Sequence, residues 1–389
     1  MKLLIVAPDF PYPPNHGGRV DIWIRLQTFI RMGFTVDLLV TSKISPTSTE
    51  LGVVKKIVRN LWFLKRRNKW WHLLSNAPLQ TVSRSELART SLSEEYDVAW
   101  LEGEYVEPIL RNPSLQAKQV FLRLQNDEYI YFQQLALSTK NLLKRTYYQT
   151  EAFKLKKLSH KLYQSVDGLF FISSKEFTQF TTRVTALKNK SWLLPAPLSK
   201  DKFNTPILGS KVIFVGSLFM SNNQEAIVWY LKNVHSLIKN PLYQLIITGN
   251  SRGVNLDWLR QATKPFSNIE FYDSPDDLEP LYAQSGIFIN PMRSGAGVKL
   301  KTLEAIQNGL ALVSTETGIE GTDLEPENHF LLADSPEDFA SQVERLLGNT
   351  TLQSSLIISG QQFLRQHYDH QAILTKIFTT QFSTLVETK

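Results

Sequence analysis

The most informative segment of the chain spans residues 287–321 and reads IFINPMRSGAGVKLKTLEAIQNGLALVSTETGIEG. It opens with an apolar run that ends at Met292 and continues through a loop rich in glycine and lysine. From Leu300 onward the apolar residues recur at the spacing of a helix, until an Asn-Gly pair ends the pattern before a second apolar run at residues 310–314. The segment therefore predicts a strand, a loop, a helix and another strand.

The loop and the helix start carry residues suited to a nucleotide diphosphate. The relevant residues are Arg293, Gly295, Gly297, Lys299 and Lys301. Free N–H groups at a helix start, next to cations, favour a bound phosphate. Glu304 has the wrong charge for phosphate, but a carboxylate beside such a site suits the hydroxyl pair of a ribose. The alternative is an ordinary glycine-rich turn with lysines placed by chance.

This segment resembles the donor-binding loop and helix of retaining GT-B glycosyltransferases, those of glycosyltransferase family four. That family usually has two Glu residues separated by seven positions, the second within a Leu-Glu-Ala triplet. Leu303-Glu304-Ala305 matches the triplet, whereas Ala296 stands where the first Glu would fall. The resemblance implies that Lys299 and Lys301 balance the diphosphate charge, with Arg293 as a weaker candidate. It also implies that Glu304 binds ribose and that the N–H groups of Gly297, Val298 and Lys299 hold a phosphate or sugar oxygen.

The composition is that of a large soluble enzyme. With 389 residues the chain exceeds one ordinary core, which predicts two domains. There is no cysteine, and the seven histidines lack the spacing of a zinc site. The apolar run at residues 3–7 is too short for a secretory signal, and no run approaches the ~18–20 apolar residues of a membrane span. We therefore expect a cytoplasmic protein.

Apolar runs alternate with helical patterns along the whole chain. Strand-like runs lie at residues 3–7, 36–40, 98–101, 120–124 and 169–172, and then at 212–215, 245–248, 269–272, 287–290, 310–314 and 329–332. Helical patterns between them include residues 21–32 and 142–166. Such alternation predicts buried parallel sheets in two doubly wound α/β units. Three prolines at 195–206 mark the junction.

The resemblance extends over nearly the whole chain and implies the GT-B fold, two Rossmann-like domains that face each other across a cleft. We expect residues 1–198 to form an acceptor domain and residues 199–362 a nucleotide-sugar domain. A C-terminal helix at residues 363–389 would pack back on the first. Gly216 and Ser217 follow the first strand of the second domain, where many relatives continue with an Arg and a Lys that this chain lacks. That departure gives Lys299 and Lys301 more weight.

Two polar segments of the first half are candidates for the acceptor side. His16, Gly17 and Gly18 follow the first strand, where relatives place a glycine pair that approaches the ligand, although an ordinary turn explains them too. Residues 123–128, Arg-Leu-Gln-Asn-Asp-Glu, resemble a family motif that has His in place of Gln125. Glutamine cannot transfer a proton, so Asn126 and Glu128 remain as binding residues, with helix capping as the alternative.

The implied reaction moves a sugar from a nucleotide diphosphate to an acceptor hydroxyl with retention of configuration, as a hexosyltransferase would. The donor would be a UDP-, GDP- or similar nucleotide sugar and the acceptor a glycan or a lipid-linked sugar, as in polysaccharide or glycolipid assembly. No metal or other cofactor is expected. Glu320 could touch ribose or base, or it could be a solvated turn residue. A catalytically inactive scaffold and a nucleotide-sugar epimerase of the same fold remain the alternatives.

Charge is unevenly distributed, with a basic first half, an acidic second half and a net charge of +7. We find no nucleic-acid-binding signature. The segment from Lys55 to Trp71 interleaves cations with three tryptophans, which is typical of a helix at a membrane interface. We therefore expect peripheral binding to the anionic inner face of a membrane, the alternative being a helix whose tryptophans pack on the domain.

Overall fold

The computed structural model describes residues 1–15, 17–198, 202–295 and 297–382. The chain divides into two compact units, which we call unit 1 (Met1–Pro197 and His370–Lys389) and unit 2 (Leu198–Asp369). The division falls beside residue 198. The return of the chain to unit 1 begins at His370 rather than at residue 363.

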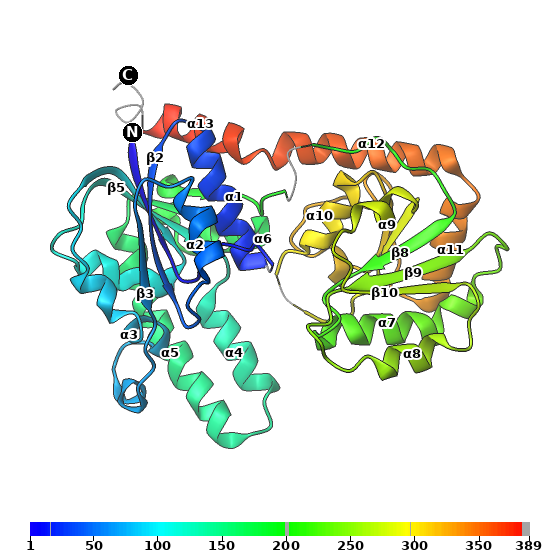
Figure 1. Cartoon of the computed structure of the whole chain (residues 1–389), viewed down its shortest axis with the longest axis horizontal. Helices are drawn as coiled ribbons and strands as arrows, with labels where there is room; N and C mark the ends of the chain where they lie inside the picture. The colour runs from blue at the N-terminus through cyan, green and yellow to red at the C-terminus, as the bar shows by residue number, and fades with distance from the viewer. Residues whose placement is uncertain (16, 199–201, 296, 383–389) are drawn as a thin grey trace. The chain divides into compact units, whose positions relative to one another are not determined.

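Unit 1 is built on a parallel sheet covered by helices on both faces (Figure 1). Its strands are β1 (Lys2–Ala7), β2 (Thr35–Ser42), β3 (Leu61–Lys65), β4 (Glu95–Glu102), β5 (Gln116–Leu124), β6 (Gly168–Phe171) and β7 (Ser191–Leu193). Its helices and helical turns are α1 (Gly17–Arg31), α2 (Ser48–Lys55), η1 (Trp70–Leu74), α3 (Leu79–Val82), η2 (Ser85–Arg89), η3 (Glu104–Arg111), α4 (Glu128–Ser138), α5 (Leu142–Ser165), α6 (Ser174–Arg183), η4 (Thr185–Lys190) and α13 (His370–Gln381). In the described part of unit 1 the strand order is β3-β2-β1-β4-β5-β6-β7.

Unit 2 repeats this architecture with a smaller parallel sheet. Its strands are β8 (Lys211–Val215), β9 (Gln244–Gly249), β10 (Ile269–Asp273), β11 (Ile287–Asn290), β12 (Ala311–Ser314) and β13 (Leu331–Leu332). Its helices and helical turns are α7 (Ser221–Asn233), η5 (His235–Leu237), α8 (Asp257–Thr263), α9 (Glu279–Ala283), α10 (Leu300–Gln307), η6 (Thr317–Ile319), α11 (Pro336–Leu347) and α12 (Thr350–His367). The order of the described strands is β10-β9-β8-β11-β12-β13.

The expected strands are confirmed because their apolar runs are buried on both sheet faces. Ile5 of β1, for example, pairs with Leu38 of β2 and with Trp100 of β4, and all three side chains are buried. In unit 1 one face is covered by α1, α2 and α13, and the other by η2, η3, α5 and α6. Such double coverage is what continuous apolar strands require. The fold class is therefore confirmed for each unit.

The expected interfacial helix in the segment from Lys55 to Trp71 is wrong. α2 ends at Lys55, and β3 then pairs in parallel with β2, with Trp62 opposite Leu39 and Phe63 opposite Val40. Trp62 packs on one face of the sheet and Phe63 on the other. Successive residues of this short apolar run pack on opposite faces of the sheet, as in any strand. This packing stabilises a strand here, although the basic residues on either side suggested a helix.

The C-terminal segment forms two helices instead of one. α12 ends at His367 and belongs to unit 2, whereas α13 begins at His370 and belongs to unit 1. Leu374, Ile377 and Phe378 of α13 are buried in the unit 1 core, and Phe378 stacks on Phe29 of α1 with the ring centres 6.4 Å apart. The end of the expected helix, beyond residue 382, lies outside the described residues.

Candidate functional site

The loops after β8 and β11 lie where the strand order of the unit 2 sheet reverses. These two strands are neighbours, while β9 and β10 continue the sheet on one side and β12 and β13 on the other. In open parallel sheets the loops at such a point diverge and leave room for a ligand at the carboxyl ends of the strands. The β11–α10 loop carries the residues expected to bind phosphate, and the loop after β8 carries Gly216 and Ser217.

The β11–α10 loop folds around the ammonium group of Lys299. Nζ of Lys299 donates to the carbonyl oxygens of Gly295 (2.9 Å) and Gly297 (2.7 Å). Both glycines have positive φ, 115° and 82°, and a Cβ at Gly295 would lie 2.8 Å from Nδ2 of Asn222. The loop therefore needs glycine at both positions and is held by Lys299. Ala296 lies outside the described residues.

Lys299 is consequently occupied by its own loop. Its side chain is buried, and Nζ also lies 3.7 Å from a carboxylate oxygen of Glu320. Burial lowers the pKa of Lys299, and the charge of Glu320 opposes that shift. An ammonium group that donates to two loop carbonyls has few hydrogen bonds left for a ligand. We interpret Lys299 chiefly as the residue that shapes the loop.

Lys301 points instead toward the start of α7. Its Nζ donates to Oδ1 of Asn223 (2.9 Å) and lies 4.6 Å from the ring centre of Phe214. Burial, together with the charge of Lys299, lowers the pKa of Lys301 to about 7. Within the described part of the chain, no carboxylate forms an ion pair with Lys301. A partly desolvated cation without an acidic partner is suited to an anionic ligand.

Glu304 lies one turn beyond Lys301 on α10, so the two side chains share a face of the helix. Its carboxylate is half-buried near Tyr282. Burial raises the pKa of Tyr282 well above its ordinary value, and the charge of Glu304 raises it further. The Tyr282 hydroxyl is buried without a hydrogen-bond partner among the described residues. The helix thus presents a cation near its start and a carboxylate one turn later.

Asn223 joins the two loops at the reversal point. Its Oδ1 accepts from Lys301, and its Nδ2 donates to the carbonyl oxygen of Ser217 (3.1 Å). Gly216 lies against the next strand end, where a Cβ on Gly249 would approach the Gly216 oxygen to 1.7 Å. Asn223 was not among the residues predicted for the site, so its linking role was missed. Its position in the first turn of α7 was the available signal.

The other residues expected near the donor lie at the margin of this site. Arg293 is exposed, donates to the carbonyl oxygen of Asp334 (3.2 Å) and covers the ring of Trp229 at 4.9 Å. Trp229 lies two turns beyond Asn223 on α7, about 9 Å along the helix, so Arg293 is not among the contacts of Lys301. Val298 is half-buried beside Gly321, where a Cβ would lie 3.0 Å from its Cγ2.

Neither α7 nor α10 has a side-chain cap at its described N-terminus. The N-cap positions are Met220 for α7 and Lys299 for α10, and neither side chain accepts from the first turn. Main-chain N–H groups at a helix start that lack a capping side chain can bind an anion. Both helix starts border the loops at the reversal point, so their dipoles add to the charge of Lys301.

In unit 1, Gly17 and Gly18 form the first turn of α1, and His16 lies outside the described residues. Arg19, in the same turn, donates to the carboxylate of Asp9 (2.8 Å) in the loop after β1. β1 and β4 are neighbours at the point where the unit 1 strand order reverses. The glycine pair therefore lies at the edge where this sheet would bind a ligand.

Asn126 and Glu128 lie on either side of a helix cap. Asn126 is exposed, whereas Asp127 caps α4 by accepting from the N–H of Ile130 (3.1 Å). Glu128 is half-buried and accepts a hydrogen bond from the Tyr105 hydroxyl. Burial raises the pKa of Glu128 to about 7. Capping thus belongs to Asp127, and Glu128 has the perturbed titration that often marks a functional residue.

A buried ionic network fixes α1 on the unit 1 sheet, and sequence analysis missed it. Arg25 of α1 donates to Glu102 of β4 through Nε (2.6 Å) and to Asp21 one turn earlier (3.1 Å). Arg123 of β5 also donates to Asp21 (3.1 Å) and to the carbonyl oxygen of Pro195 (3.1 Å). Arg123 and Arg25 hold the pKa of Asp21 well below its usual value, despite burial. The network therefore positions the α1 start that carries the glycine pair.

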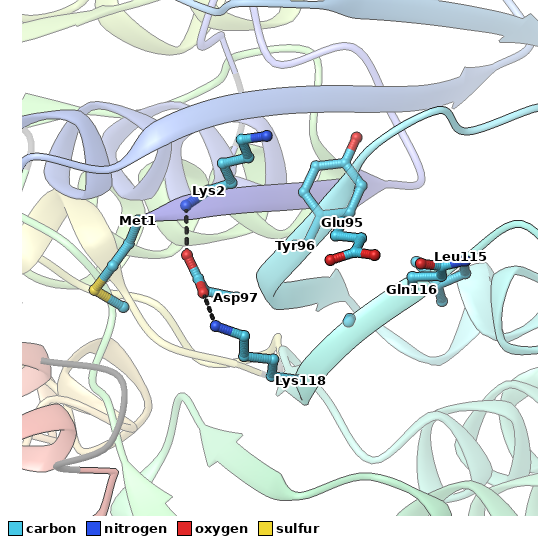
Figure 2. Close-up of a pocket in the computed structure, with 9 residues that line it drawn as sticks. Met1, Lys2, Glu95, Tyr96, Asp97, Leu115, Gln116 and Lys118 are labelled. Carbon is cyan, nitrogen blue, oxygen red and sulfur yellow. Dashed lines mark hydrogen bonds and ion pairs between the residues drawn. The ribbon is translucent and has the colours of Figure 1, made fainter. Parts of the chain in front are cut away.

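A pocket of about 690 Å³ lies at the opposite, amino edge of the unit 1 sheet, as Figure 2 shows. Lys2, Asp97 and Lys118 are among its lining residues, and Asp97 accepts from the Lys2 main-chain N–H (2.8 Å) and from Nζ of Lys118 (2.7 Å). The charges here neutralise one another. The pocket contains none of the residues expected at the site.

No group of three or more His, Cys, Asp or Glu side chains is close enough to hold a metal ion in the described part of the chain. Within residues 1–15, 17–198, 202–295 and 297–382, no helix has both the length and the apolar character needed to cross a membrane.

Comparison with known proteins identifies relatives of the whole chain. A family model described as glycosyl transferases group 1 matches residues 209–349. An uncharacterized 44.6 kDa protein in the cps region of Klebsiella pneumoniae is 34% identical and aligns over 97% of this chain and 99% of its own length. The fold matches sucrose-phosphate synthase of Thermosynechococcus elongatus with a TM-score of 0.66, at 11% identity and full coverage of both chains.

A second similar structure is HepE of Anabaena in complex with UDP-glucose. Its TM-score is 0.64 at 13% identity, with coverage of 98% of this chain and all of that one. The family match falls on unit 2, which contains the loop and helix described above, and the structural matches extend over both units. The chain therefore belongs to the group 1 glycosyl transferases and has the GT-B fold.

Proposed function

We propose that the protein transfers a sugar from a nucleotide diphosphate sugar to an acceptor hydroxyl with retention of configuration, as a hexosyltransferase would. The observation that carries this proposal is Lys301, a half-buried cation without an acidic partner among the described residues, at the reversal point of the unit 2 sheet. Glu304 follows one turn later. A diphosphate at Lys301 would place the attached ribose further along α10, toward Glu304.

The donor in this proposal is UDP-glucose or a related UDP- or GDP-sugar. HepE of Anabaena, which shares the fold, was obtained in complex with UDP-glucose. The relative from the cps region of Klebsiella pneumoniae supports a role in polysaccharide assembly, with a glycan or lipid-linked acceptor. The donor is therefore assigned by chemical class, as a nucleotide diphosphate sugar.

Catalysis in this scheme consists mainly of stabilising the leaving group. The bond between the anomeric carbon and the diphosphate oxygen breaks, and the acceptor oxygen bonds to that carbon on the same face. The acceptor proton moves to the departing phosphate oxygen, so that a nucleoside diphosphate is released. Lys301 and the N–H groups of Gly297, Val298 and Lys299 stabilise the charge that develops on this oxygen. Lys299 holds the loop and adds charge, and Arg293 contributes at longer range.

The remaining donor residues have supporting roles. Glu304 accepts hydrogen bonds from the ribose hydroxyls, and Glu320 lies close enough to Lys299 to orient it (3.7 Å). Gly216 and Ser217 supply main chain at the second helix start. In unit 1, we assign Gly17, Gly18, Asn126 and Glu128 to the acceptor. His16, which lies outside the described residues, belongs to the same proposal.

The direct experiment supplies a panel of nucleotide sugars and follows both binding and turnover. A donor that binds stabilises the protein by RT ln(1 + [L]/Kd), so thermal shift identifies it, and chromatography then detects release of the nucleoside diphosphate. Full activity in EDTA is expected, because the proposed leaving-group stabilisation uses Lys301 and main-chain N–H groups. Donor binding without release or transfer would favour a scaffold protein. Conversion of the bound sugar to its epimer would favour an epimerase.

We also propose that unit 1 docks on an anionic membrane surface. The docking surface differs from the single interfacial helix expected from the sequence. Of the three tryptophans in the Lys55 to Trp71 segment, Trp62 is packed, whereas Trp70 and Trp71 in η1 are 73% and 49% exposed. Nζ of Lys154 in α5 donates to the carbonyl oxygen of Leu73 (3.3 Å), so η1 lies against α5.

The hairpin of α4 and α5 extends this surface, and Figure 1 shows it projecting from the sheet of unit 1. Its tip exposes Leu137, Leu142 and Leu143, the last to 85%. The cations next to this tip are Lys140, Lys144 and Arg145, whereas Lys156, Lys157 and Lys161 lie farther along α5. Exposed leucine and tryptophan side chains surrounded by Lys and Arg favour the interface of an anionic bilayer.

A further inference from the structure

Two arginines of unit 1, Arg66 and Arg84, lie at the carboxyl edge of its sheet and form no ion pair with any described residue. Arg66 immediately follows β3, and Arg84 reaches the ends of β1 and β2. Within the described residues no Asp or Glu oxygen lies at ion-pair distance from either guanidinium group. This is the edge of an open parallel sheet at which ligands bind.

Arg84 is a buried cation that main-chain and neutral groups hold in place. Its Nε donates to Oγ1 of Thr41 (3.0 Å), its Nη1 to the carbonyl oxygen of Gln80 (2.7 Å) and its Nη2 to that of Pro8 (3.1 Å). Burial, together with the charge of Arg66, lowers the pKa of Arg84 to about 9. A guanidinium group that is buried without a counter-ion is stabilised when an anion approaches.

Arg66 is the group of the pair that can contact a ligand. Its Nε donates to Oγ of Ser83 (2.7 Å), the residue before Arg84, and its four remaining N–H groups have no hydrogen-bond partner among the described residues. The side chain is half-buried, and burial lowers its pKa. A guanidinium fork with two free nitrogens fits a phosphate through paired hydrogen bonds.

The carboxylates nearest to the pair are already engaged by other groups. Glu128 accepts from the Tyr105 hydroxyl, and the Tyr105 ring lies 5.4 Å from Cζ of Arg84. Asp9 accepts from Arg19 (2.8 Å) and from Oγ of Ser42 (2.8 Å). The two positive charges at this edge are therefore balanced only by more distant carboxylates. The electrostatic potential beside Arg66 is consequently positive and attracts an anionic ligand.

We propose that Arg66 and Arg84 form a binding site for a phosphate or diphosphate group, in which Arg66 makes the contacts and Arg84 supplies buried charge behind it. In the proposed glycosyl transfer this group belongs to the acceptor, and that assignment rests on the proposed function. The two arginines belong to unit 1, whereas the donor loop belongs to unit 2. Anion binding by unit 1 and donor turnover by unit 2 can therefore succeed or fail independently.

The test is a titration of the full-length protein with inorganic pyrophosphate, followed through the arginine Nε–H resonances in ¹⁵N NMR. The Arg66 and Arg67 signals are assigned with Arg66→Lys and Arg67→Lys. Arg67 is the matched control, since it is the adjacent residue, is 69% exposed and pairs with Glu86 (3.6 Å). We expect a saturable shift of the Arg66 signal and little shift of the Arg67 signal. No shift at Arg66, or an equal shift of both signals that sodium chloride reproduces, would overturn the proposal.

A second measurement separates the sources of the phosphate. Calorimetry should show that the protein binds farnesyl diphosphate. Arg66→Gln should raise the Kd about tenfold or more, as expected for loss of a paired charge-assisted contact. Arg67→Gln should leave the Kd within twofold of the parent protein. Vesicles of phosphatidylglycerol should bind both variants equally if the site accepts a diphosphate rather than a lipid headgroup. Unchanged diphosphate affinity in a folded Arg66→Gln protein would contradict the site, as would a loss confined to vesicles.

Discussion

Replacing Lys301 by Met removes the charge that we place beside the leaving group and retains most of the side-chain volume. The substitution should lower kcat by ~10²–10³, the usual cost of removing one contact to a developing anion. Its effect on folding should be small or stabilising, because the ammonium group is partly desolvated and burial already lowers its pKa to about 7. A loss of activity would therefore not reflect unfolding.

The magnitude follows from the surroundings of Lys301. Within the described residues its partners are a neutral amide, Asn223, and the ring of Phe214, so no carboxylate reduces its field. A unit charge ~4 Å away interacts with about 4 kcal/mol at an effective dielectric constant of 20. Part of that energy already stabilises the bound donor, so the part that acts only on the transition state should lie toward the lower end of the ~2.7–4 kcal/mol typical of such contacts.

The assay is steady-state release of the nucleoside diphosphate, with melting temperature measured on every variant. Lys232→Met is the matched control, because Lys232 is an exposed lysine of α7 outside the two loops. Lys299→Met should also reduce activity, but with lower thermal stability, since the loop loses the hydrogen bonds to Gly295 and Gly297. If Lys301→Met keeps kcat within threefold of the parent protein, the electrostatic role assigned to Lys301 is wrong.

Three other predictions concern the donor and the membrane. Because the pKa of Lys301 is lowered to about 7, the free protein loses that charge as the pH rises through 7. A bound diphosphate raises the pKa of Lys301 again, so nucleotide affinity should fall by up to tenfold per pH unit above 7. Isothermal titration of Lys301→Met should show no such dependence of affinity on pH. Glu304→Gln should weaken nucleotide binding by ~1–3 kcal/mol in calorimetry, as for a lost charge-assisted hydrogen bond, and an unchanged Kd would remove Glu304 from the ribose site. Co-sedimentation with phosphatidylglycerol vesicles should decline at high salt and drop sharply for the double variant Leu142→Asp, Leu143→Asp. The control variant Leu242→Asp, at an exposed leucine of unit 2, should bind normally. Equal binding of both variants would contradict the proposal that the α4–α5 hairpin docks on the membrane.

The sheets could be predicted from sequence because their strands are buried on both faces. An uninterrupted apolar run such as residues 287–290 has few interpretations when helical patterns flank it, and the structure places it as β11. β3 was missed for the opposite reason. Its apolar residues are few and are flanked by Lys and Arg on both sides. The basic neighbours therefore suggested an amphipathic helix, and the alternation of a strand was not recognised.

The candidate site was only partly accessible from sequence. Spacing identified Lys299 and Lys301 as a pair, but the path of the loop decides that Lys299 donates to its own carbonyls and that Lys301 does not. The ionic network could not be predicted, because Arg25 and Glu102 are 77 residues apart. The Arg66 and Arg84 pair depends in the same way on β3 and α3, since Ser83 is what brings the two guanidinium groups together.

The central claim is that the protein transfers sugar from a nucleotide diphosphate with retention, and one measurement tests it most directly. Incubation with UDP-glucose, and then with other UDP- and GDP-sugars, is followed by ¹H NMR of the anomeric signals and of the released nucleoside diphosphate. The account predicts, for at least one donor, release of the nucleoside diphosphate together with a first-formed product that has the donor's anomeric configuration. A product of the opposite configuration would contradict retention, and the absence of release from every donor in the panel would contradict glycosyl transfer itself.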